Sequence, residues 1–159
     1  MNRLWMAPHG LHIEPAEGRD AEVLANLHAQ GFHRGWPVAD FQSYIAGRDT
    51  PVYVACDARR KIAGFAMLRI AADEAELITI AVDRRWRKKG VGQALMRALF
   101  DDLQMTPARK LFLEVASDNP AALQLYTRNG FARISERQGY YARPDGRPAT
   151  AIVMSRDLH

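Results

Sequence analysis

The sequence contains a single cysteine and has no long apolar run. Cys56 is alone among 159 residues, so no disulfide can form within the chain. It closes the strand-like run Val52–Ala55, where we expect a buried, inert thiol. No segment approaches the roughly 20 apolar residues that span a bilayer, and Met1–Leu11 lacks the apolar run of a signal peptide. We therefore expect a cytoplasmic protein with no membrane partner.

Metal-binding and nucleic-acid-binding motifs are likewise missing. The histidines show no compact spacing with cysteine or carboxylates; they are His9, His12, His28, His33 and His159. The formal charge of +4 and the pI near 9.5 favour acidic ligands. Because the basic residues follow no pattern that reads DNA or RNA, we assign this charge to phosphate recognition at one site. We expect neither a metal ion nor direct nucleic-acid binding.

What the sequence does contain is the composition of one globular domain, organised around the stretch Ile78–Phe100. Hydrophobic residues make up 48% of the chain and charged residues 25%. Ile78–Val82 is mostly β-branched, as in a strand buried on both faces, and apolar residues recur at helical spacing after Gly90. Between them lies the basic, glycine-containing segment Arg87–Gly92. Glycine backbone freedom and the positive N-terminal end of a helix together are typical of a phosphate-binding loop.

Three kinds of phosphate loop can be compared with this segment. A P-loop requires Gly-Lys-Ser/Thr, and the sequence Gly92-Gln93-Ala94 excludes it. A dinucleotide fingerprint needs a glycine where Leu95 stands, although Glu114 lies near the distance expected of a ribose-binding acid. The third pattern, Arg/Gln-x-x-Gly-x-Gly/Ala, fits Arg87–Gly92 and resembles the acetyl-CoA pyrophosphate loop of the GNAT superfamily of N-acetyltransferases. Alternatively, the segment is only a glycine-containing turn whose basic side chains are exposed to solvent and bind no ligand.

Periodicity and turn signals predict the remaining elements. Strands are expected at 11–16, 52–56, 62–70, 78–82, 110–115, 131–137 and 149–158, and helices at 20–30, 37–46, 91–103 and 120–129. Asp20 and Asn119 are expected to cap two helices, and Asp73–Glu76 to form the turn into the organising strand. This order predicts an α+β (mixed α/β) sandwich, with a central, mostly antiparallel sheet flanked by about four helices. We expect one domain over residues 1–159, with an N-terminal extension at 1–10.

The likeness to the GNAT superfamily extends beyond the loop. Residues Phe112–Val115, Ser117–Ala122 and Leu125–Tyr126 are similar to its second signature region. More narrowly, the chain resembles the bacterial ribosomal-protein-alanine N-acetyltransferases, in the segments 73–75, 80–83, 113–115, 140–146 and 151–154. The resemblance implies a GNAT-type fold and transfer of acetyl from acetyl-CoA to a primary amine. The implied acceptor is the N-terminal α-amine of a ribosomal protein that begins with alanine.

The resemblance also implies catalytic roles for Glu114 and Tyr126. Glu114 would be the general base, acting directly or through water, and Tyr126 the general acid that protonates the leaving CoA thiolate. A peptide α-amine has a pKa of about 7.7–8.0 against about 10.4 for lysine, so an N-terminal acceptor needs little help to lose its proton. The alternatives are a solvent-facing strand residue for Glu114 and a core tyrosine for Tyr126.

Contacts with acetyl-CoA follow from the same resemblance. Backbone groups of Ile80, Ala81 and Val82 would pair with the pantetheine arm, with the Val82 amide polarising the thioester carbonyl. Asn119 would contact CoA as well as cap its helix. The pyrophosphate would be held chiefly by backbone amides, over the residues Lys88, Lys89, Gly90, Val91, Gly92 and Gln93. The side chains of Lys88 and Lys89 could instead only solvate the turn.

The acceptor site is assigned to aromatic and acidic residues. Trp36 in an early loop and Tyr140 and Tyr141 in a late one could close over a peptide N-terminus. Asp73, Glu74 or Glu76 could attract a basic chain. Packed aromatics and a solvated acidic turn are the alternatives. Two other functions stay open: a GNAT enzyme acting on a small amine, antibiotic or lysine side chain, and a non-enzymatic module that senses acetyl-CoA. Thr150, at a common aspartate position, puts peptide selectivity in question.

Overall fold

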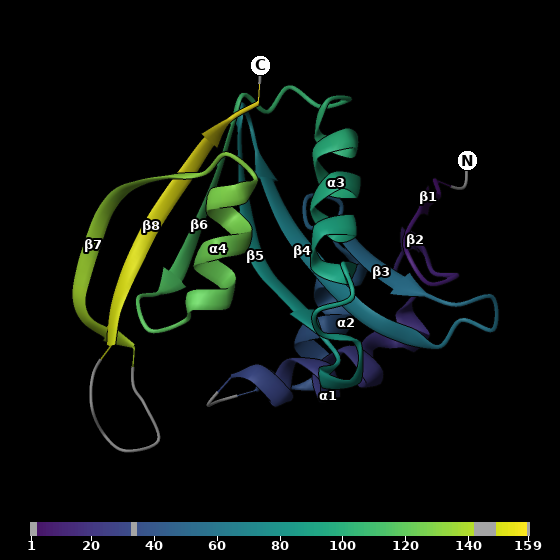
Figure 1. Cartoon of the computed structure of the whole chain (residues 1–159). Coiled ribbons are helices and arrows are strands. Elements are labelled where there is room, and N and C mark those ends of the chain that lie inside the picture. The colour runs from purple at the N-terminus through teal and green to yellow at the C-terminus, as the bar shows by residue number, and fades with distance from the viewer. Residues whose placement is uncertain (1–2, 33–34, 142–148, 159) are drawn as a thin grey trace.

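The computed structural model describes residues 3–32, 35–141 and 149–158, and for residues 139–141 and 149 it describes the backbone alone. Over these residues the chain forms strands and helices in the order expected from the sequence (Figure 1). The elements are β1 (Trp5–Met6), β2 (His12–Pro15), the 3-10 helix η1 (Gly18–Asp20), α1 (Ala21–Gly31), α2 (Val38–Ala46), β3 (Val52–Cys56), β4 (Ile62–Ala71), β5 (Glu74–Val82), the 3-10 helix η2 (Arg84–Trp86), α3 (Val91–Leu103), β6 (Lys110–Ala116), α4 (Pro120–Arg128), β7 (Ala132–Tyr141) and β8 (Ala149–Asp157).

The strands of the described residues form one sheet in the spatial order β1-β2-β3-β4-β5-β6-β8-β7. Neighbouring strands are antiparallel except β5 and β6, which are parallel and connected through α3. A parallel pair requires such a crossover, because its strands start at the same edge of the sheet. The prediction of a mixed α/β fold with a mostly antiparallel sheet is confirmed.

Different helices cover the two faces of the sheet, and each face has its own core. On the α3/α4 face, α3 buries Leu95, Leu99 and Leu103 against strand residues that include Leu111 and Leu113. On the α1/α2 face, Leu24, Leu27 and Phe41 pack on residues of β3 and β4. Burial of each such side chain stabilises the fold by about 1.5–3 kcal/mol. None of the helices among the described residues is long and apolar enough to cross a membrane.

The pairing between β5 and β6 stops partway along both strands. Their residues pair from Glu74 with Lys110 as far as Leu77 with Leu113. Beyond that point β5 continues beside β4 alone and β6 beside β8 alone, and Figure 1 shows the two strands running apart with α4 in front of the gap. The carboxyl ends of β5 and β6 therefore present unpaired backbone edges to each other.

A β-bulge in β5 lies where the two strands part. Opposite β4, Leu77 pairs with Leu68 and Thr79 with Met67, which leaves Ile78 without a partner. The extra residue changes the alternation, so that Leu77 and Ile80 both pack on the α3/α4 face and Ile78 faces the α1/α2 face. A bulge of this kind bends and twists the strand that carries it.

Four sequence predictions need correction. The organising strand begins at Glu74, and the turn before it is Ala72-Asp73, so Glu74 and Glu76 lie on β5. This strand is not buried on both faces, because its unpaired part, 78–82, is half-exposed except at Thr79. The strand expected first, at 11–16, is the second strand (β2), because Trp5 and Met6 of the N-terminal extension form an earlier one that pairs with Ile13 and His12.

The fourth correction concerns Asp20. Its side chain does not cap α1; it accepts hydrogen bonds from the Glu17 amide (2.7 Å) and from the Arg60 guanidinium (2.7 and 2.9 Å). The carboxylate instead completes the capping box at the start of η1, and its hydrogen bonds from the Arg60 guanidinium are charge-assisted.

Candidate active site

The loop before α3 has the backbone geometry of an anion site. Gly90 is the N-cap residue of α3 and adopts a left-handed conformation, with φ of 81°, and Lys88 two residues earlier also has a positive φ of 62°. The first bond of the helix runs from the Ala94 amide to the Gly90 carbonyl (3.0 Å), so the amides of Val91, Gly92 and Gln93 precede the hydrogen-bonded ladder. Free amides and the positive end of the helix dipole favour phosphate there.

Two side chains of the loop are engaged within the protein. The Lys89 ammonium lies over the ring of Trp86, 5.2 Å from its centroid. The side-chain amide of Gln93 exchanges two hydrogen bonds with the side-chain amide of Asn129, at 2.9 and 2.8 Å, and so connects α3 to the end of α4. The side chains of Lys89 and Gln93 thus have partners within the protein, whereas the backbone amides at the start of α3 face an anion freely.

Asp83 fixes the start of the loop. Its carboxylate accepts from the Arg85 amide (3.0 Å) and from the Arg85 guanidinium. These hydrogen bonds with Arg85 hold the pKa of Asp83 below its usual value, against the opposing effect of burial. The Asp83 amide donates to the Ala63 carbonyl (2.8 Å), which anchors the loop to β4.

The predicted pantetheine residues lie on the free edge of β5. Ile80, Ala81 and Val82 are half-buried and pair with β4 only. A β-carbon at Gly64 would come within 2.9 Å of the Ala81 carbonyl oxygen, so β4 and β5 approach closely here because residue 64 is glycine. The other edge of this stretch of β5 faces the gap.

Glu114 and Tyr126 lie on opposite faces of the sheet. Glu114 is the first residue of β6 beyond the paired region; Leu113 and Val115 beside it face α3 and α4, so the Glu114 side chain points to the α1/α2 face. It is 28% exposed and forms an ion pair with Arg137 of β7 (3.4 Å). Tyr126 of α4 is 7% exposed and packs edge-on against Phe131 in the core of the other face. The two side chains thus lie on opposite faces of the sheet, with Glu114 next to the opening.

Asn119 has the capping geometry expected from the sequence. Its side-chain oxygen accepts a hydrogen bond from the Ala122 amide (3.2 Å), and Pro120 occupies the first turn of α4. The cap places the first turn of α4 directly after β6, which is the strand that carries Glu114.

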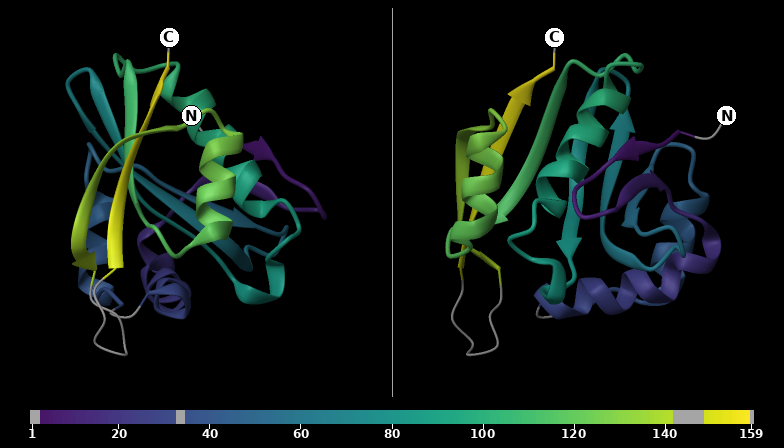
Figure 2. Two further views of the ribbon diagram at one scale, coloured as in Figure 1. Left: turned by 60° about the vertical axis from the view of Figure 1, so that its left-hand side comes forward. Right: turned by 45° about the vertical axis from the view of Figure 1, so that its right-hand side comes forward.

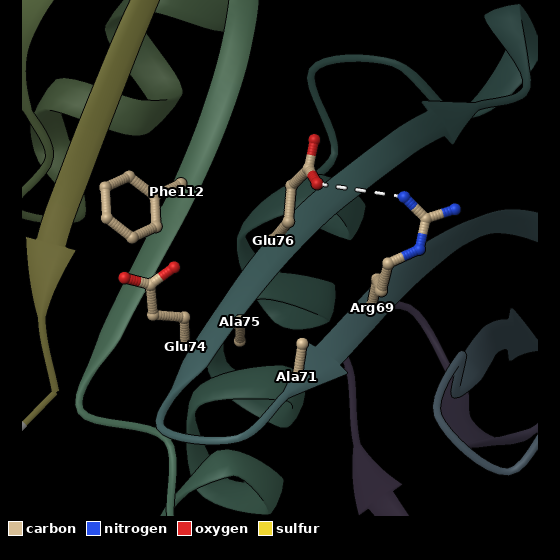
Figure 3. A pocket seen from close by; sticks show the side chains of 6 residues that line it. All are labelled: Arg69, Ala71, Glu74, Ala75, Glu76 and Phe112. Atoms are coloured by element: carbon tan, nitrogen blue, oxygen red, sulfur yellow. Dashed lines mark ion pairs between the residues drawn. The ribbon is translucent and has the colours of Figure 1, made fainter.

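An acidic hollow lies on the paired part of β5 and β6, two residues before Glu114 along β6. It has a volume of about 260 Å³ and is lined by Arg69, Ala71, Glu74, Ala75, Glu76 and Phe112. Figure 3 shows Glu74 pointing toward Phe112, while Glu76 turns toward Arg69, with an ion pair of 3.9 Å. Glu74 and Glu76, two of the acidic residues considered for the acceptor, thus line one hollow together with Phe112, which the sequence analysis did not assign.

The aromatic residues predicted to bind the acceptor do not line the acidic hollow among the residues whose side chains are described. Trp36 stacks on His28 (4.3 Å between ring centroids) and contacts Phe41 and Tyr44. It therefore packs at the edge of the α1/α2 core and does not line the acidic hollow. Tyr140 and Tyr141 were placed in a loop, but their backbone belongs to β7. The positions of their side chains, and the loop from 142 to 148, lie outside the described residues.

The structure brings together a polar cluster that sequence spacing did not reveal. His12 Nε2 lies 3.0 Å from Glu14 Oε2 and 3.4 Å from Cys56 Sγ, because His12 and Cys56 are cross-strand partners in β2 and β3. All three could offer ligand atoms to a metal, so the argument from spacing was incomplete. Arg60 pairs with the other oxygen of Glu14. Burial acts to raise the pKa of Glu14, but hydrogen bonds from Arg60 and His12 outweigh it and hold the pKa low.

A parted pair of parallel strands, with an anion loop at a helix N-terminus beside it, defines an acyl-CoA N-acyltransferase architecture. Residues 21–131 match the acetyltransferase (GNAT) family. The chain therefore belongs to the GNAT acetyltransferase family.

Within that family the most similar proteins carry related names. The chain is 41% identical over 95 residues to the [ribosomal protein bS18]-alanine N-acetyltransferase of Escherichia coli K12, a match that spans 60% of this chain and 64% of that protein. It is 36% identical over 144 residues, 87% of each chain, to the N-alpha-acetyltransferase RimI of Mycobacterium tuberculosis. The crystal structure of the ribosomal-protein-S18-alanine N-acetyltransferase from Escherichia coli superimposes with a TM-score of 0.85 at 30% identity, covering 93% of this chain and 94% of that one.

Proposed function

We propose that this protein transfers the acetyl group of acetyl-CoA to the N-terminal α-amine of a ribosomal protein that begins with alanine. The observation that carries the proposal is the divergence of β5 and β6 after Leu77 and Leu113, with Glu114 next to the opening on one face of the sheet. The names of the relatives support this acceptor, and the acidic hollow beside Glu114 is suited to a basic chain.

Acetyl-CoA fits the described residues at two points. The positive φ of Gly90 and the leading amides of α3 suit a pyrophosphate. The free edge of Ile80–Val82 offers backbone groups to an extended pantetheine amide, as a neighbouring strand would. A thioester carried along that edge enters the gap between β5 and β6.

The two catalytic residues have complementary tasks in this proposal. Glu114, directly or through one water, takes the proton that the amine nitrogen loses as it forms its bond to the thioester carbonyl carbon. The carbon–sulfur bond then breaks, and Tyr126 gives its phenolic proton to the departing sulfur, which has a pKa near 8.5 as a free thiol. Attack is direct, without an acyl-enzyme. The opposite positions of the two side chains keep proton removal and proton delivery apart.

The chemistry of the acceptor favours an α-amine. Its pKa of about 7.7–8.0 leaves a useful neutral fraction at physiological pH, whereas a lysine side chain, at about 10.4, is almost wholly charged. Glu74 and Glu76 lie on the same face of the sheet as Glu114, where the residues after the N-terminus of an acceptor would pass. A chain with arginine or lysine near its N-terminus would be attracted there.

The test is mass spectrometry after incubation with acetyl-CoA and two peptides. One is a basic peptide with a free N-terminal alanine, and the other is the same peptide blocked at its N-terminus but retaining a lysine. We expect acetylation of the free alanine alone. Acetylation of the lysine peptide would overturn the proposed acceptor, and binding of acetyl-CoA without modification of either peptide would leave the small-amine and sensor alternatives.

A further inference from the structure

The polar cluster of His12, Glu14 and Cys56 lies away from the gap between β5 and β6. Its residues belong to β2 and β3, and β4 separates these strands from β5. Figure 2 shows β2 on the side of the sheet opposite β7 and β8. Cys56 belongs to the α1/α2 core, and His12 and Glu14 share its face, because Ile13 between them packs in the other core. The cluster therefore takes no part in the proposed acetyl transfer.

Strand pairing brings the three side chains together and holds them in place. His12 is the cross-strand partner of Cys56, and Glu14 follows two residues along β2 on the same face. The other edge of β2 is paired with β1, which is anchored in turn, because the Trp5 indole donates a hydrogen bond to Asp101 of α3 (2.8 Å). Side chains carried by paired strands are held more precisely than side chains carried by loops.

The distances within the cluster are close to those between ligands of one small cation. Nε2 of His12 lies 3.4 Å from Sγ of Cys56 and 3.0 Å from Oε2 of Glu14, and the three atoms all lie within 4.8 Å of one another. Around a tetrahedral zinc ion with bonds of about 2.0–2.3 Å, neighbouring ligand atoms are about 3.3–3.5 Å apart. A shift of a few tenths of an ångström would therefore suit the cluster to such an ion.

The carboxylate of Glu14 is oriented by contacts on its far side. Arg60 pairs with Oε1 of Glu14, so Oε2 is the oxygen that is directed at His12. The Arg60 guanidinium is itself held by Asp20, which is 5% exposed, through hydrogen bonds of 2.7 and 2.9 Å. Carboxylates that bind metal ions are commonly oriented by hydrogen bonds of this kind.

The charges and the donor atoms favour a divalent zinc ion. Glu14 and Asp20 are two anions and Arg60 is one cation, so a thiolate at Cys56 would leave the group with an excess of negative charge that a divalent ion neutralises. Thiolate, imidazole and carboxylate are the ligands of zinc sites, whereas Mg²⁺ and Ca²⁺ prefer oxygen atoms alone.

We propose that His12, Glu14 and Cys56 bind one Zn²⁺ ion through Nε2, Oε2 and Sγ, with a water molecule as the fourth ligand. Cys56 loses its thiol proton to the solvent as the zinc–sulfur bond forms, and Nε2 of His12 binds without a proton. The side chains of His12 and Glu14 are 20% and 23% exposed and leave the ion a route from solvent, while Cys56 closes the inner side. The ion joins β2 to β3. This proposal replaces the expectation, drawn from sequence spacing, that no metal binds.

The test is calorimetric titration of Zn²⁺ into metal-depleted protein that carries no histidine tag. We expect one ion to bind per chain. Cys56→Ala and His12→Gln should each weaken binding by more than about 100-fold, since even the partners of metal ligands contribute 10–100-fold. His9→Gln, which removes an exposed histidine three residues before His12, is the matched control and should bind as the wild-type protein does.

Cobalt and thermal unfolding provide two further readouts. Co²⁺ occupies zinc sites, and a cobalt–thiolate bond absorbs in the near ultraviolet, so the wild-type protein and His9→Gln should show this band and Cys56→Ala should lack it. Zn²⁺ should raise the unfolding temperature of the wild-type protein and leave that of Cys56→Ala unchanged, because an ion that binds only the folded state stabilises it. Unfolding without metal verifies that each variant folds.

Three results would overturn the inference. They are a wild-type protein that binds no Zn²⁺, a cobalt complex without the thiolate band, and Cys56→Ala and His12→Gln variants that bind Zn²⁺ as tightly as the wild-type protein. None of these measurements uses acetyl-CoA, so each outcome leaves the proposed acetyl transfer to be decided by its own test.

Discussion

At the scale of single residues, Glu114 and Tyr126 can be tested separately from acetyl-CoA binding, because the proposed anion and pantetheine contacts are backbone groups of other segments. Glu114→Gln and Tyr126→Phe should each lower kcat by about 100-fold, the usual contribution of one proton-transfer group, with an unchanged dissociation constant for acetyl-CoA. Phenylalanine retains the ring that packs on Phe131.

The control for these variants is Glu136→Gln, which removes an exposed carboxylate of β7 whose recorded ion pair is with Arg133 (3.8 Å). It should leave steady-state rates unchanged. Wild-type turnover in both catalytic variants would refute the assignment of base and acid.

His28 should make the fold sensitive to acid. It is 1% exposed, its ring nitrogens have no hydrogen-bond partner among the described residues, and Phe32 and Trp36 stack on its two faces. Burial lowers the pKa of His28 to about 4, from an ordinary value near 6.5. Between these values His28 is protonated in the unfolded chain but not in the folded protein. The free energy of unfolding is therefore highest above pH 6.5 and falls as the pH drops toward 4.

We therefore expect His28 to lower the free energy of unfolding of the wild-type protein by about 2–3 kcal/mol between pH 7 and pH 4.5. His28→Phe should abolish this decrease. Urea denaturation of both proteins at the two pH values measures it. His9→Gln, at an exposed histidine, should keep the wild-type loss. The idea fails if the His28 variant loses as much stability as the wild-type protein.

At the scale of elements, two glycines at the start of α3 have different roles: Gly90 adopts a left-handed conformation, whereas Gly92 lies inside the helix. Gly90→Ala forces a β-carbon into a left-handed conformation and should lower the free energy of unfolding by about 1 kcal/mol. Gly92 lies inside the helix without positive φ, and a β-carbon there would meet Leu125 at an ordinary 3.4 Å. Gly92→Ala should therefore keep or raise stability, by up to about 1 kcal/mol from helix propensity.

Both glycine variants should weaken acetyl-CoA binding, because the added methyl group stands next to the amides that face the pyrophosphate. Thermal unfolding and calorimetric titration separate the two effects. If Gly92→Ala bound acetyl-CoA as the wild-type protein does, close approach of a ligand to this turn would be ruled out.

Arg60 links three elements on the α1/α2 face. From the turn between β3 and β4 it pairs with Glu14 of β2 and with Asp20 at the start of α1, which is 5% exposed. Arg60→Met would leave both carboxylates part-buried and unpaired with a cation, at a cost of about 3 kcal/mol in the free energy of unfolding. The difference should shrink at a pH below the lowered pKa of Glu14, where that carboxyl is protonated in both proteins.

Arg59→Met changes the neighbouring, exposed arginine and serves as the control for Arg60. It should alter stability by less than about 0.5 kcal/mol. An Arg60 variant as stable as the Arg59 variant would show that the cluster around His12 and Cys56 does not depend on this ion pair.

At the scale of the whole molecule, one sheet carries both cores, so we expect the chain to unfold as a single unit. Leu24→Ala in the α1/α2 core and Leu95→Ala in the α3/α4 core each create a cavity and should each cost about 3 kcal/mol. Both should shift the same transition when unfolding is followed by near- and far-UV circular dichroism. Two separate transitions, each moved by one of the variants, would contradict the prediction of a single domain.

The sequence by itself determined the elements and the loop chemistry. Periodicity located the helices and most strands within a few residues, because whether a segment buries a face is a local property of its side chains. The turn at Gly90 and the helix cap at Asn119 could likewise be predicted from the sequence, since left-handed turns and caps depend on the identity of one residue and its immediate neighbours. The resemblance on these residues led to the family that the comparisons then showed.

Tertiary structure alone decided what depends on contacts between distant segments. The parting of β5 from β6, the bulge at Ile78 and the placement of Glu114 opposite Tyr126 follow from strand register, which no local pattern encodes. The same reason explains why His12 meets Cys56, why Trp36 packs on His28, and why the extension lies on α3. A segment's own residues set its conformation, whereas its neighbours are chosen by the packing of the whole chain.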